Sequence, residues 1–170
     1  MSKSIENLPN EITVRYTLPS DGVYLKLWLM DEGTQKSFPM ANEMEIDDAV
    51  NRWIAFSKFK CSLTVLVDNI PSGIATLYLQ PYGKLAHQCE FGIIVDPNCR
   101  NLGIGSYLMN CLIHLAKTKF KIELLHLQVN GENQAMNLYK RFGFKEFGRQ
   151  TSWLKEGDRY GTRVFMERFI

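Results

Sequence analysis

Residues 90–129 change their hydrophobic period twice, and this change constrains the fold more than any other feature of the chain. Residues 90–95 form a short apolar run that ends at Asp96-Pro97, as expected of a strand. Residues 103–120 follow a period of 3.6, and residues 124–129 are again strand-like. The sequence therefore predicts a strand-helix-strand unit with a loop that contains Gly103 and Gly105.

The predicted helix at residues 103–120 is amphipathic. Its polar face carries Ser106, Asn110, His114 and Lys117, and its apolar stripe consists of Ile104, Leu108, Leu112 and Ala116, widened by Met109, Ile113 and Leu115. Such a stripe is typical of a helix that packs on a sheet.

The flanking sequence predicts further strands and helices. We expect a strand at residues 12–18, helices at 23–30 and 49–59, a hairpin of strands 63–67 and 74–79, a helix at 134–142 closed by Gly143, and a last strand pair at 145–153 and 163–169. The order is β-α-α-β-β-β-α-β-α-β-β. It predicts an α/β protein with a mixed sheet and helices on both faces. No linker or repeat divides the chain, so we expect one domain over residues 1–170, with residues 1–10 as its candidate flexible end.

Composition argues against several classes of protein. Twenty basic and eighteen acidic residues leave a net charge of +2 without long charge blocks, which does not indicate nucleic-acid binding. The four cysteines form no C-x-x-C pair, so we expect reduced thiols and neither a disulfide scaffold nor a metal site. No apolar run approaches the ~20 residues of a membrane span, and residues 1–10 do not resemble a signal peptide. We expect a cytoplasmic protein with no membrane partner.

The loop before the long helix has the composition of a phosphate site. Gly103 and Gly105 open a helix whose N-terminus carries a partial positive charge, and Arg100 adds a full charge. A Walker loop would have Lys-Ser/Thr after its last glycine, where this chain has Ser106-Tyr107. A dinucleotide loop would have a third glycine, where this chain has Leu108. Both of those nucleotide loops are disfavoured.

The remaining interpretation rests on two motifs. Residues 91–105, with the pattern Arg-x-x-Gly-x-Gly, resemble the pyrophosphate motif of the GNAT superfamily of N-acetyltransferases. Residues 135–144 resemble the Ala-x-x-Leu-Tyr-x-x-x-Gly-Phe helix of the same family, and one helix and one strand separate the two motifs, as in that family. The resemblance covers residues 90–147.

The resemblance implies an acetyl-CoA-dependent N-acetyltransferase that moves an acetyl group to a primary amine by direct attack. The strand that ends at Val95 would splay from its neighbour, and a backbone N–H near Ile93 or Ile94 would polarise the thioester carbonyl. Tyr139 would donate a proton or hydrogen bond to the departing thiolate. The implied cofactor-binding residues are Ile93, Ile94, Val95, Arg100, Asn101, Leu102, Gly103, Ile104, Gly105, Ser106 and Asn133. Asn133 lies two residues before Ala135 rather than the three usual in the family, and helix capping explains it equally well.

Amine acetylation also calls for a base. An amine with a lysine-like pKa near ~10.4 is only about one part in ~2,500 neutral at pH 7, a handicap of roughly 4.6 kcal/mol. A carboxylate that takes the proton would lower this handicap. Glu90 at the start of the strand is the first candidate, because Gln128 on the next strand cannot usefully accept a proton; His87 is the second.

Several alternatives remain open. The same fold could serve as a non-catalytic acyl-CoA sensor, or the loop could bind ATP or NAD. The acyl group could be acetyl or longer. The acidic residues 43–48 would suit a cationic acceptor such as a polyamine or aminoglycoside, but a protein N-terminus or lysine is also compatible. The protein could be a monomer or a homodimer. Trp28, Trp53, residues 38–40, Trp153 and Tyr160 could shape an acceptor pocket or simply pack in the core.

Overall fold

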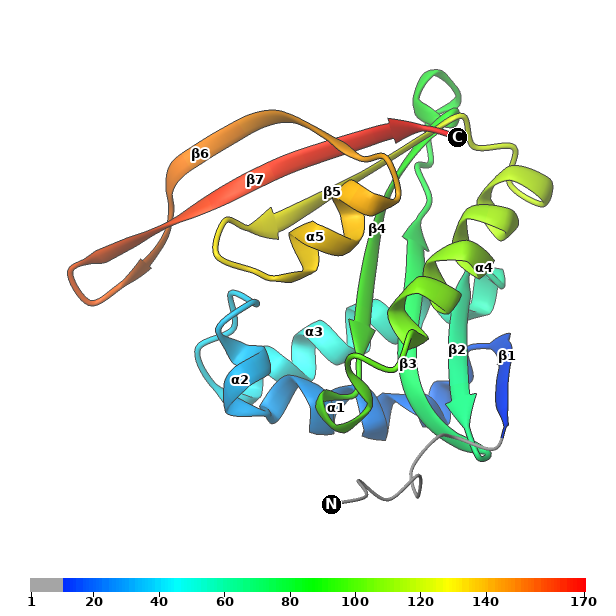
Figure 1. Ribbon diagram of the computed structural model, residues 1–170, viewed down its shortest axis with the longest axis horizontal. Helices are drawn as coiled ribbons and strands as arrows, with labels where there is room; N and C mark the ends of the chain where they lie inside the picture. The colour runs from blue at the N-terminus through cyan, green and yellow to red at the C-terminus, as the bar shows by residue number, and fades with distance from the viewer. Residues whose placement is uncertain (1–10) are drawn as a thin grey trace, which may run out of the picture.

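The structure is a computed structural model that describes residues 11–170, and the candidate flexible residues 1–10 lie outside the described part. Its centre is one seven-stranded sheet with the strand order β1-β2-β3-β4-β5-β7-β6 (Figure 1). The strands are β1 (Ile12–Tyr16), β2 (Ser62–Val67), β3 (Ile70–Tyr78), β4 (Gln88–Val95), β5 (Leu124–Asn130), β6 (Lys145–Glu156) and β7 (Arg159–Phe169). The helices are α1 (Gly22–Met30), α2 (Glu32–Gln35), α3 (Glu43–Ala55), α4 (Ile104–Thr118) and α5 (Ala135–Arg141).

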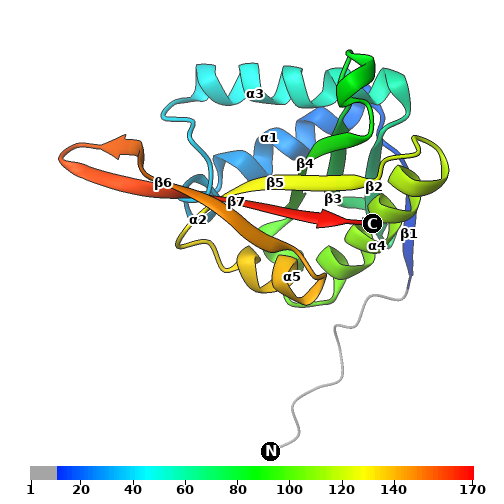
Figure 2. The ribbon, with the colours of Figure 1, turned by 90° about the horizontal axis from the view of Figure 1, so that it is seen from above.

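The sheet is mixed and has helices on both faces, as the sequence predicts. Only β4 and β5 pair in parallel; every other neighbouring pair is antiparallel. Helices α4 and α5 cover one face, and α1 and α3 cover the other (Figure 2). Two buried clusters fill these layers. The larger lies under α4 and α5, and the smaller joins α1 and α3 to Ile74 and Ile94 of the sheet.

The predicted apolar stripe of α4 is confirmed. Ile104, Leu108, Met109, Leu112, Leu115 and Ala116 are buried against the sheet. Gly143 also ends α5 as predicted, with a left-handed backbone (φ 80°). The N–H groups of Gly143 and Phe144 donate to the carbonyls of Lys140 and Tyr139, which closes the helix in a Schellman arrangement. The chain then turns directly into β6.

The predicted turn of the first hairpin is wrong. The sequence pattern places residues 70–73 in the loop, whereas in the structure they belong to β3. The turn consists only of Asp68 and Asn69, both with positive φ (50° and 66°), which is the geometry that two-residue hairpin turns require. A shift of register between Val65 and Leu66 accommodates Pro71 within the strand.

The predicted bounds of the helix at residues 49–59 are also wrong. Helix α3 begins at Glu43, because Asn42 caps it by accepting the N–H of Glu45 (3.0 Å) and the Glu45 carboxylate accepts the N–H of Ala41 (2.6 Å). The helix ends at Ala55, where a 3-10 turn takes over. The one-turn helix α2 was not predicted, since four residues show no period. Strand β1 is shorter than predicted, and β6 and β7 extend further toward their turn at Gly157.

All four cysteines are free thiols in the structure. Cys61 and Cys89 are buried, and burial raises the pKa of the Cys61 thiol to about 11 and that of Cys89 to about 12. These two thiols are therefore protonated at neutral pH and serve as small core residues.

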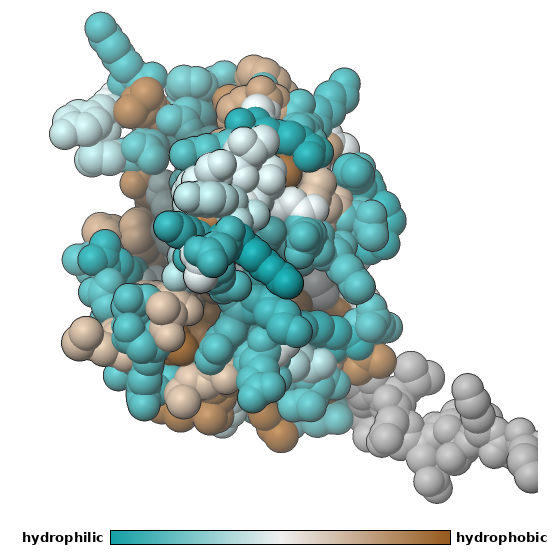
Figure 3. Space-filling model, turned by 90° about the vertical axis from the view of Figure 1, so that its left-hand side faces the viewer, coloured by the Kyte–Doolittle hydropathy of each residue, from teal (hydrophilic) through white to brown (hydrophobic). Residues whose placement is uncertain are grey.

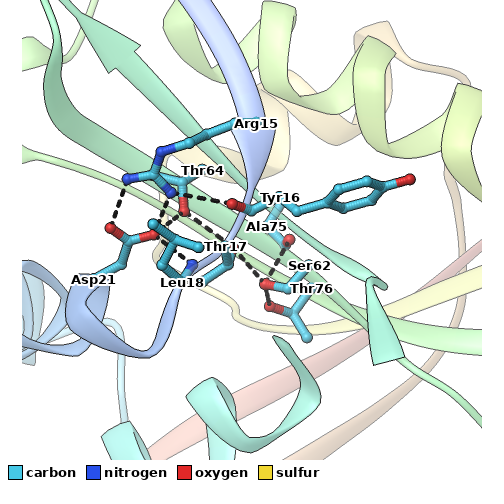
Figure 4. Close-up of polar contacts among 9 residues, drawn as sticks. All are labelled: Arg15, Tyr16, Thr17, Leu18, Asp21, Ser62, Thr64, Ala75 and Thr76. Carbon is cyan, nitrogen blue, oxygen red and sulfur yellow. Dashed lines mark hydrogen bonds and ion pairs between the residues drawn. The ribbon is translucent and has the colours of Figure 1, made fainter. Parts of the chain in front are cut away.

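A buried polar network links β1 to the face of the sheet that α1 and α3 cover (Figure 4). The Asp21 carboxylate, 2% exposed, accepts hydrogen bonds from Arg15 (2.7 and 2.9 Å) and from the Thr64 hydroxyl (2.8 Å). From there the hydroxyls of Thr64, Thr17, Ser62 and Thr76 bond in sequence, and the Trp53 indole N–H donates to Thr76 (2.7 Å). The network thus fixes Trp53 beside Gly92 of β4.

We expect Asp21→Asn to lower the free energy of unfolding by about 2–3 kcal/mol, because it leaves Arg15 and two further donors without their charged acceptor. Burial would raise the pKa of Asp21, but the hydrogen bonds from Arg15, the Leu18 N–H and Thr64 outweigh it, and the pKa lies below its ordinary value of 3.8. The ionised carboxylate therefore stabilises the fold above pH 3.8, and this contribution is lost as the pH falls through the lower folded pKa.

Urea unfolding of wild type and Asp21→Asn at several pH values measures this difference. It should shrink below pH 3.8. Asp48→Asn is the matched control, because the Asp48–Arg52 pair is largely exposed and should contribute under about 1 kcal/mol. Equal effects of the two substitutions would contradict the assignment.

Candidate active site

Strands β4 and β5 separate part-way along their length. They pair only at Gln88↔Leu124, Cys89↔Leu125 and Glu90↔His126. Beyond this point β4 continues along β3 to Val95, while β5 continues along β7 to Asn130. Within residues 11–170, the edge of β4 that faces β5 therefore has no strand beside it from Phe91 onward, and the two strands form a V-shaped opening in the sheet (Figure 1).

A cleft of about 420 Å³ occupies this opening. One side is the end of β4 with the loop that leads into α4, and the other side is α5. The segment from α2 to Phe38 closes it at one end. Its lining from β4, the loop and α4 comprises Ile93, Ile94, Val95, Cys99, Arg100, Asn101, Gly103, Gly105 and Ser106; its lining from the other side includes Asn133, Asn137, Leu138, Tyr139 and Arg141.

The N-terminus of α4 faces this cleft with unused donors. Gly103 precedes the helix in the left-handed region (φ 81°), which favours glycine, and no side chain caps the helix. Within residues 11–170, no hydrogen bond engages the N–H groups of Ile104, Gly105 and Ser106. A Cβ on Gly103 would meet nothing within 4 Å, so the space beside it is open. These groups fit the pyrophosphate of a nucleotide-bearing cofactor.

Arg100 lies beside these donors but points across the cleft. Its Nη2 donates to the Thr34 hydroxyl (2.7 Å), which in turn donates to the Asp31 carboxylate (2.9 Å). Hydrogen bonds from the Thr34 N–H and hydroxyl, together with the charge of Arg100, hold the pKa of Asp31 below its usual range. Arg100 therefore joins the loop to α2, a contact over 66 positions of sequence that no local pattern indicates.

Tyr139 combines a buried ring with access to the cleft. The ring is 7% exposed and packs edge-on against Phe91 and Phe144, with centroids 6.1 and 6.2 Å away. Burial raises the pKa of its phenol, so the hydroxyl keeps its proton well above neutral pH. Within residues 11–170 this hydroxyl makes no hydrogen bond, which leaves it available as a donor to a ligand in the cleft.

Two titratable side chains meet at the point where the strands separate. Glu90 and His126 are opposite each other in the β4–β5 register, and the Glu90 carboxylate also accepts a hydrogen bond from Gln128 (3.3 Å). Burial lowers the pKa of His126, although the charges of Glu90 and Glu167 oppose this, so the ring is neutral at pH 7 and can accept a proton. No local sequence pattern indicates His126, because only the register of β5 against β4 places it beside Glu90.

Comparison with known proteins shows which family has this site. The family model described as the acetyltransferase (GNAT) family matches residues 27–144, which include β4, the glycine loop, α4, β5 and α5. The chain belongs to this family. The resemblance of the two sequence motifs to GNAT proteins is thereby confirmed.

Relatives of this GNAT protein carry acetyltransferase names. It is 27% identical over 107 residues to the L-amino acid N-acetyltransferase AaaT of Escherichia coli, with 62% of this chain and 66% of the relative covered. It is 28% identical over 88 residues to the N-acetyltransferase aca1 of Schizosaccharomyces pombe, with 50% and 42% covered. The chain thus spans less than two thirds of the length of these curated relatives.

Solved structures show the GNAT fold itself. Ribosomal-protein-alanine N-acetyltransferase from Brucella melitensis superposes with a TM-score of 0.76 at 21% identity, over 93% of this chain and 99% of the other. The yncA protein from Salmonella typhimurium, solved with its cofactor acetyl-CoA, superposes with a TM-score of 0.78 at 15% identity, over 94% of both chains. The predicted fold class is therefore correct, with α2 as an addition to the predicted order.

Most predicted GNAT cofactor residues lie together on the cleft, but Leu102 and Ile104 and both base candidates, Glu90 and His87, do not line it. Ile104 is buried in the core, so only its backbone can serve a ligand, and Leu102 is exposed outside the cleft. Glu90 lies on the sheet face of α1 and α3, whereas Tyr139 packs under α5 on the other face. Glu90 and Tyr139 therefore flank the opening from opposite sides. His87 lies before β4, exposed, and its carbonyl accepts the N–H groups of Glu123 and Leu124.

Asn133 lies one residue before Gln134, the N-cap residue of α5, and its side-chain oxygen accepts the N–H of Ala135 (2.9 Å). Asn133 also lines the cleft, and this hydrogen bond leaves its amide nitrogen for a ligand. Among residues 11–170, no group of three or more His, Cys, Asp or Glu could hold a metal ion. In the same part of the chain, no helix has the length and apolar character needed to cross a membrane.

Proposed function

We propose that this GNAT protein is an acetyl-CoA-dependent N-acetyltransferase that acetylates a primary amine by direct attack. The observation that carries the proposal is the separation of β4 from β5 beside the unpartnered N-terminus of α4 and the Tyr139 hydroxyl. The names of the relatives and the acetyl-CoA bound to yncA support it. When bound, acetyl-CoA supplies an acetyl thioester whose transfer to the amine forms a C–N bond and breaks a C–S bond.

The residues of the cleft divide into binding and chemical roles. The N–H groups at Gly103 to Ser106, with Arg100, would hold the pyrophosphate. The open edge of β4 at Ile93 and Ile94 offers backbone groups to the pantetheine arm and to the carbonyl on which negative charge develops. Arg100 would exchange its contact with Thr34 for a phosphate contact.

Two protons move in the proposed reaction. Glu90 takes a proton from the attacking amine, directly or through a water, and neutral His126 beside it is a second acceptor for that proton. The Tyr139 hydroxyl donates a proton or a hydrogen bond to the departing sulfur, a role for which its raised pKa keeps it protonated.

The test is an assay of CoA release with purified protein, acetyl-CoA and a panel of primary amines, together with calorimetry of CoA binding. We expect CoA to bind and at least one amine to be acetylated, with the product identified by mass spectrometry. Binding of CoA without turnover of any amine would favour the sensor function instead. Preference for ATP or NAD over CoA in a thermal-shift panel would overturn the cofactor assignment.

The acidic segment 43–48 offers less to a cationic acceptor than its sequence suggested. Glu43 and Asp47 both pair with Lys26 (2.8 and 2.7 Å), and Asp48 pairs with Arg52 (2.8 Å). Two of these carboxylates therefore tie α3 to α1 through Lys26, and the third is paired within α3. The acceptor must therefore be inferred from the groups near the cleft itself.

A further inference from the structure

A partly buried arginine, Arg163 of β7, lies on the sheet face of α1 and α3. Arg163 of β7 is opposite Asn130 of β5, and its guanidinium stacks on the ring of Trp153 at 3.4 Å. Its Nη1 donates to the Gln128 side-chain oxygen (3.1 Å). Among residues 11–170, Arg163 forms no ion pair, and its buried Nε has no hydrogen-bond partner.

Partial burial of the Arg163 guanidinium carries a cost in free energy. A guanidinium removed from water loses solvation that a carboxylate would normally replace, and a buried N–H without an acceptor adds to the cost. Burial lowers the pKa of Arg163, although the charge of Glu90 opposes this shift. The irregular segment of β6 between Gln150 and Leu154 contains Trp153, so the strand departs from regular pairing where the ring meets the guanidinium.

Arg163 does not line the cleft itself, but hydrogen bonds of its neighbours link it to the cleft wall and to the proposed base. Asn130, its neighbour across the strand pair, donates to the carbonyl of Lys36 (3.1 Å), and the cleft-lining segment of Thr34, Ser37 and Phe38 surrounds that residue. The exposed side-chain amide of Gln128 connects Arg163 to the proposed base. Its Nε2 donates a hydrogen bond to Glu90 (3.3 Å), and its Oε1 accepts one from Arg163 (3.1 Å). The carboxamide group of Gln128 therefore lies between the Glu90 carboxylate, which can accept a proton, and the positively charged guanidinium of Arg163.

The two charges match one class of acceptor. We propose that Arg163 binds the carboxylate of a free amino acid whose amine lies toward Glu90, so that the acetyl acceptor is an amino acid and not a polyamine or a protein side chain. This inference rests on the proposed function. An amino acid presents an ammonium and a carboxylate one carbon apart, and a guanidinium recognises the carboxylate through paired N–H donors. Stacking on the Trp153 ring fixes the orientation of the guanidinium plane for that contact.

The surface around this end of the molecule agrees with a small polar acceptor. Hydrophilic residues dominate the centre of this face, and apolar residues appear in separate areas toward its upper and lower parts (Figure 3). A long apolar or lipid-like acceptor would call for a continuous apolar surface.

The experiment compares each L-amino acid with its primary amide and with the amine left after removal of its carboxylate, for example serine, serinamide and ethanolamine. We expect wild type to show kcat/KM about 30-fold or more higher for the acid than for the other two. Arg163→Gln should bring the three within about threefold, mainly through KM, and Arg163→Lys should fall between because it keeps the charge but not the planar fork. The KM for acetyl-CoA should not change.

Arg159→Gln is the matched control, since it makes the same chemical change at an exposed position of the same strand. Equal turnover of acids, amides and amines by wild type would overturn the inference while the proposed function stands. So would an Arg163→Gln enzyme that loses activity equally toward all three. If no amine is acetylated, the proposed function fails, and the carboxylate site is decided by thermal shift: amino acids must stabilise wild type and not Arg163→Gln.

Discussion

Gly105→Glu should raise the Kd for CoA at least about 100-fold, because it places a negative charge where the pyrophosphate is expected to bind. A Cβ on Gly105 would lie 3.5 Å from Leu138 and 3.8 Å from Val95, on the two walls of the cleft, so the new side chain enters the cleft. The backbone at this position needs no glycine for its φ. A glutamate in the first turn of α4 also suits the helix dipole, so the fold should tolerate the change.

Calorimetry of CoA binding checks this result, and thermal unfolding confirms that the variant is folded. Gly83→Glu is the matched control, since a side chain there meets nothing within 4 Å and lies outside the cleft. An unchanged Kd for Gly105→Glu would show that CoA does not occupy the loop before α4.

Tyr139→Phe should lower kcat about 10²–10³-fold and leave the Kd for CoA within about twofold, because only a proton donor to the departing sulfur is removed. The phenyl ring keeps its contacts with Phe91 and Phe144, and no hydrogen bond within residues 11–170 is lost. The melting temperature should therefore change little.

Steady-state kinetics with a saturating amine measures the effect of Tyr139→Phe, and Tyr160→Phe serves as the control because that ring is exposed on the hairpin. A Tyr139→Phe enzyme with normal kcat would remove Tyr139 from the reaction and favour a purely structural ring. In that case another group near the cleft must meet the sulfur.

The parts of the fold that the sequence predicted depend on local pattern. The stripe of α4, the glycine stop at Gly143 and the loop at Gly103 are each encoded within one or two turns of chain. The failures lie where a single capping residue or a two-residue turn decides the boundary, as at Asn42 and at Asp68-Asn69. Propensity over a window cannot locate such boundaries.

The candidate site was predictable only in part, for a different reason. The cofactor side is one continuous segment, so its motif could be found, and most of its residues do line the cleft. The acceptor side combines strands and loops from distant positions. His126 faces Glu90 through strand register, Arg100 reaches Thr34 across 66 positions, and Trp153 meets Arg163 through an irregular strand. None of these contacts has a local signature.

Because β4 and β5 separate, side chains and not backbone hydrogen bonds set the width of the opening between them. No backbone ladder spans it beyond Glu90, so side chains must hold its walls apart: Phe91 from β4, Tyr139 from α5 and Phe144 after it form a triangle of rings between the two halves of the sheet. Ring size is open to mutation, whereas strand spacing is not. The aperture can therefore evolve by single substitutions while the sheet stays unchanged, and one scaffold can be refitted to acceptors of different bulk.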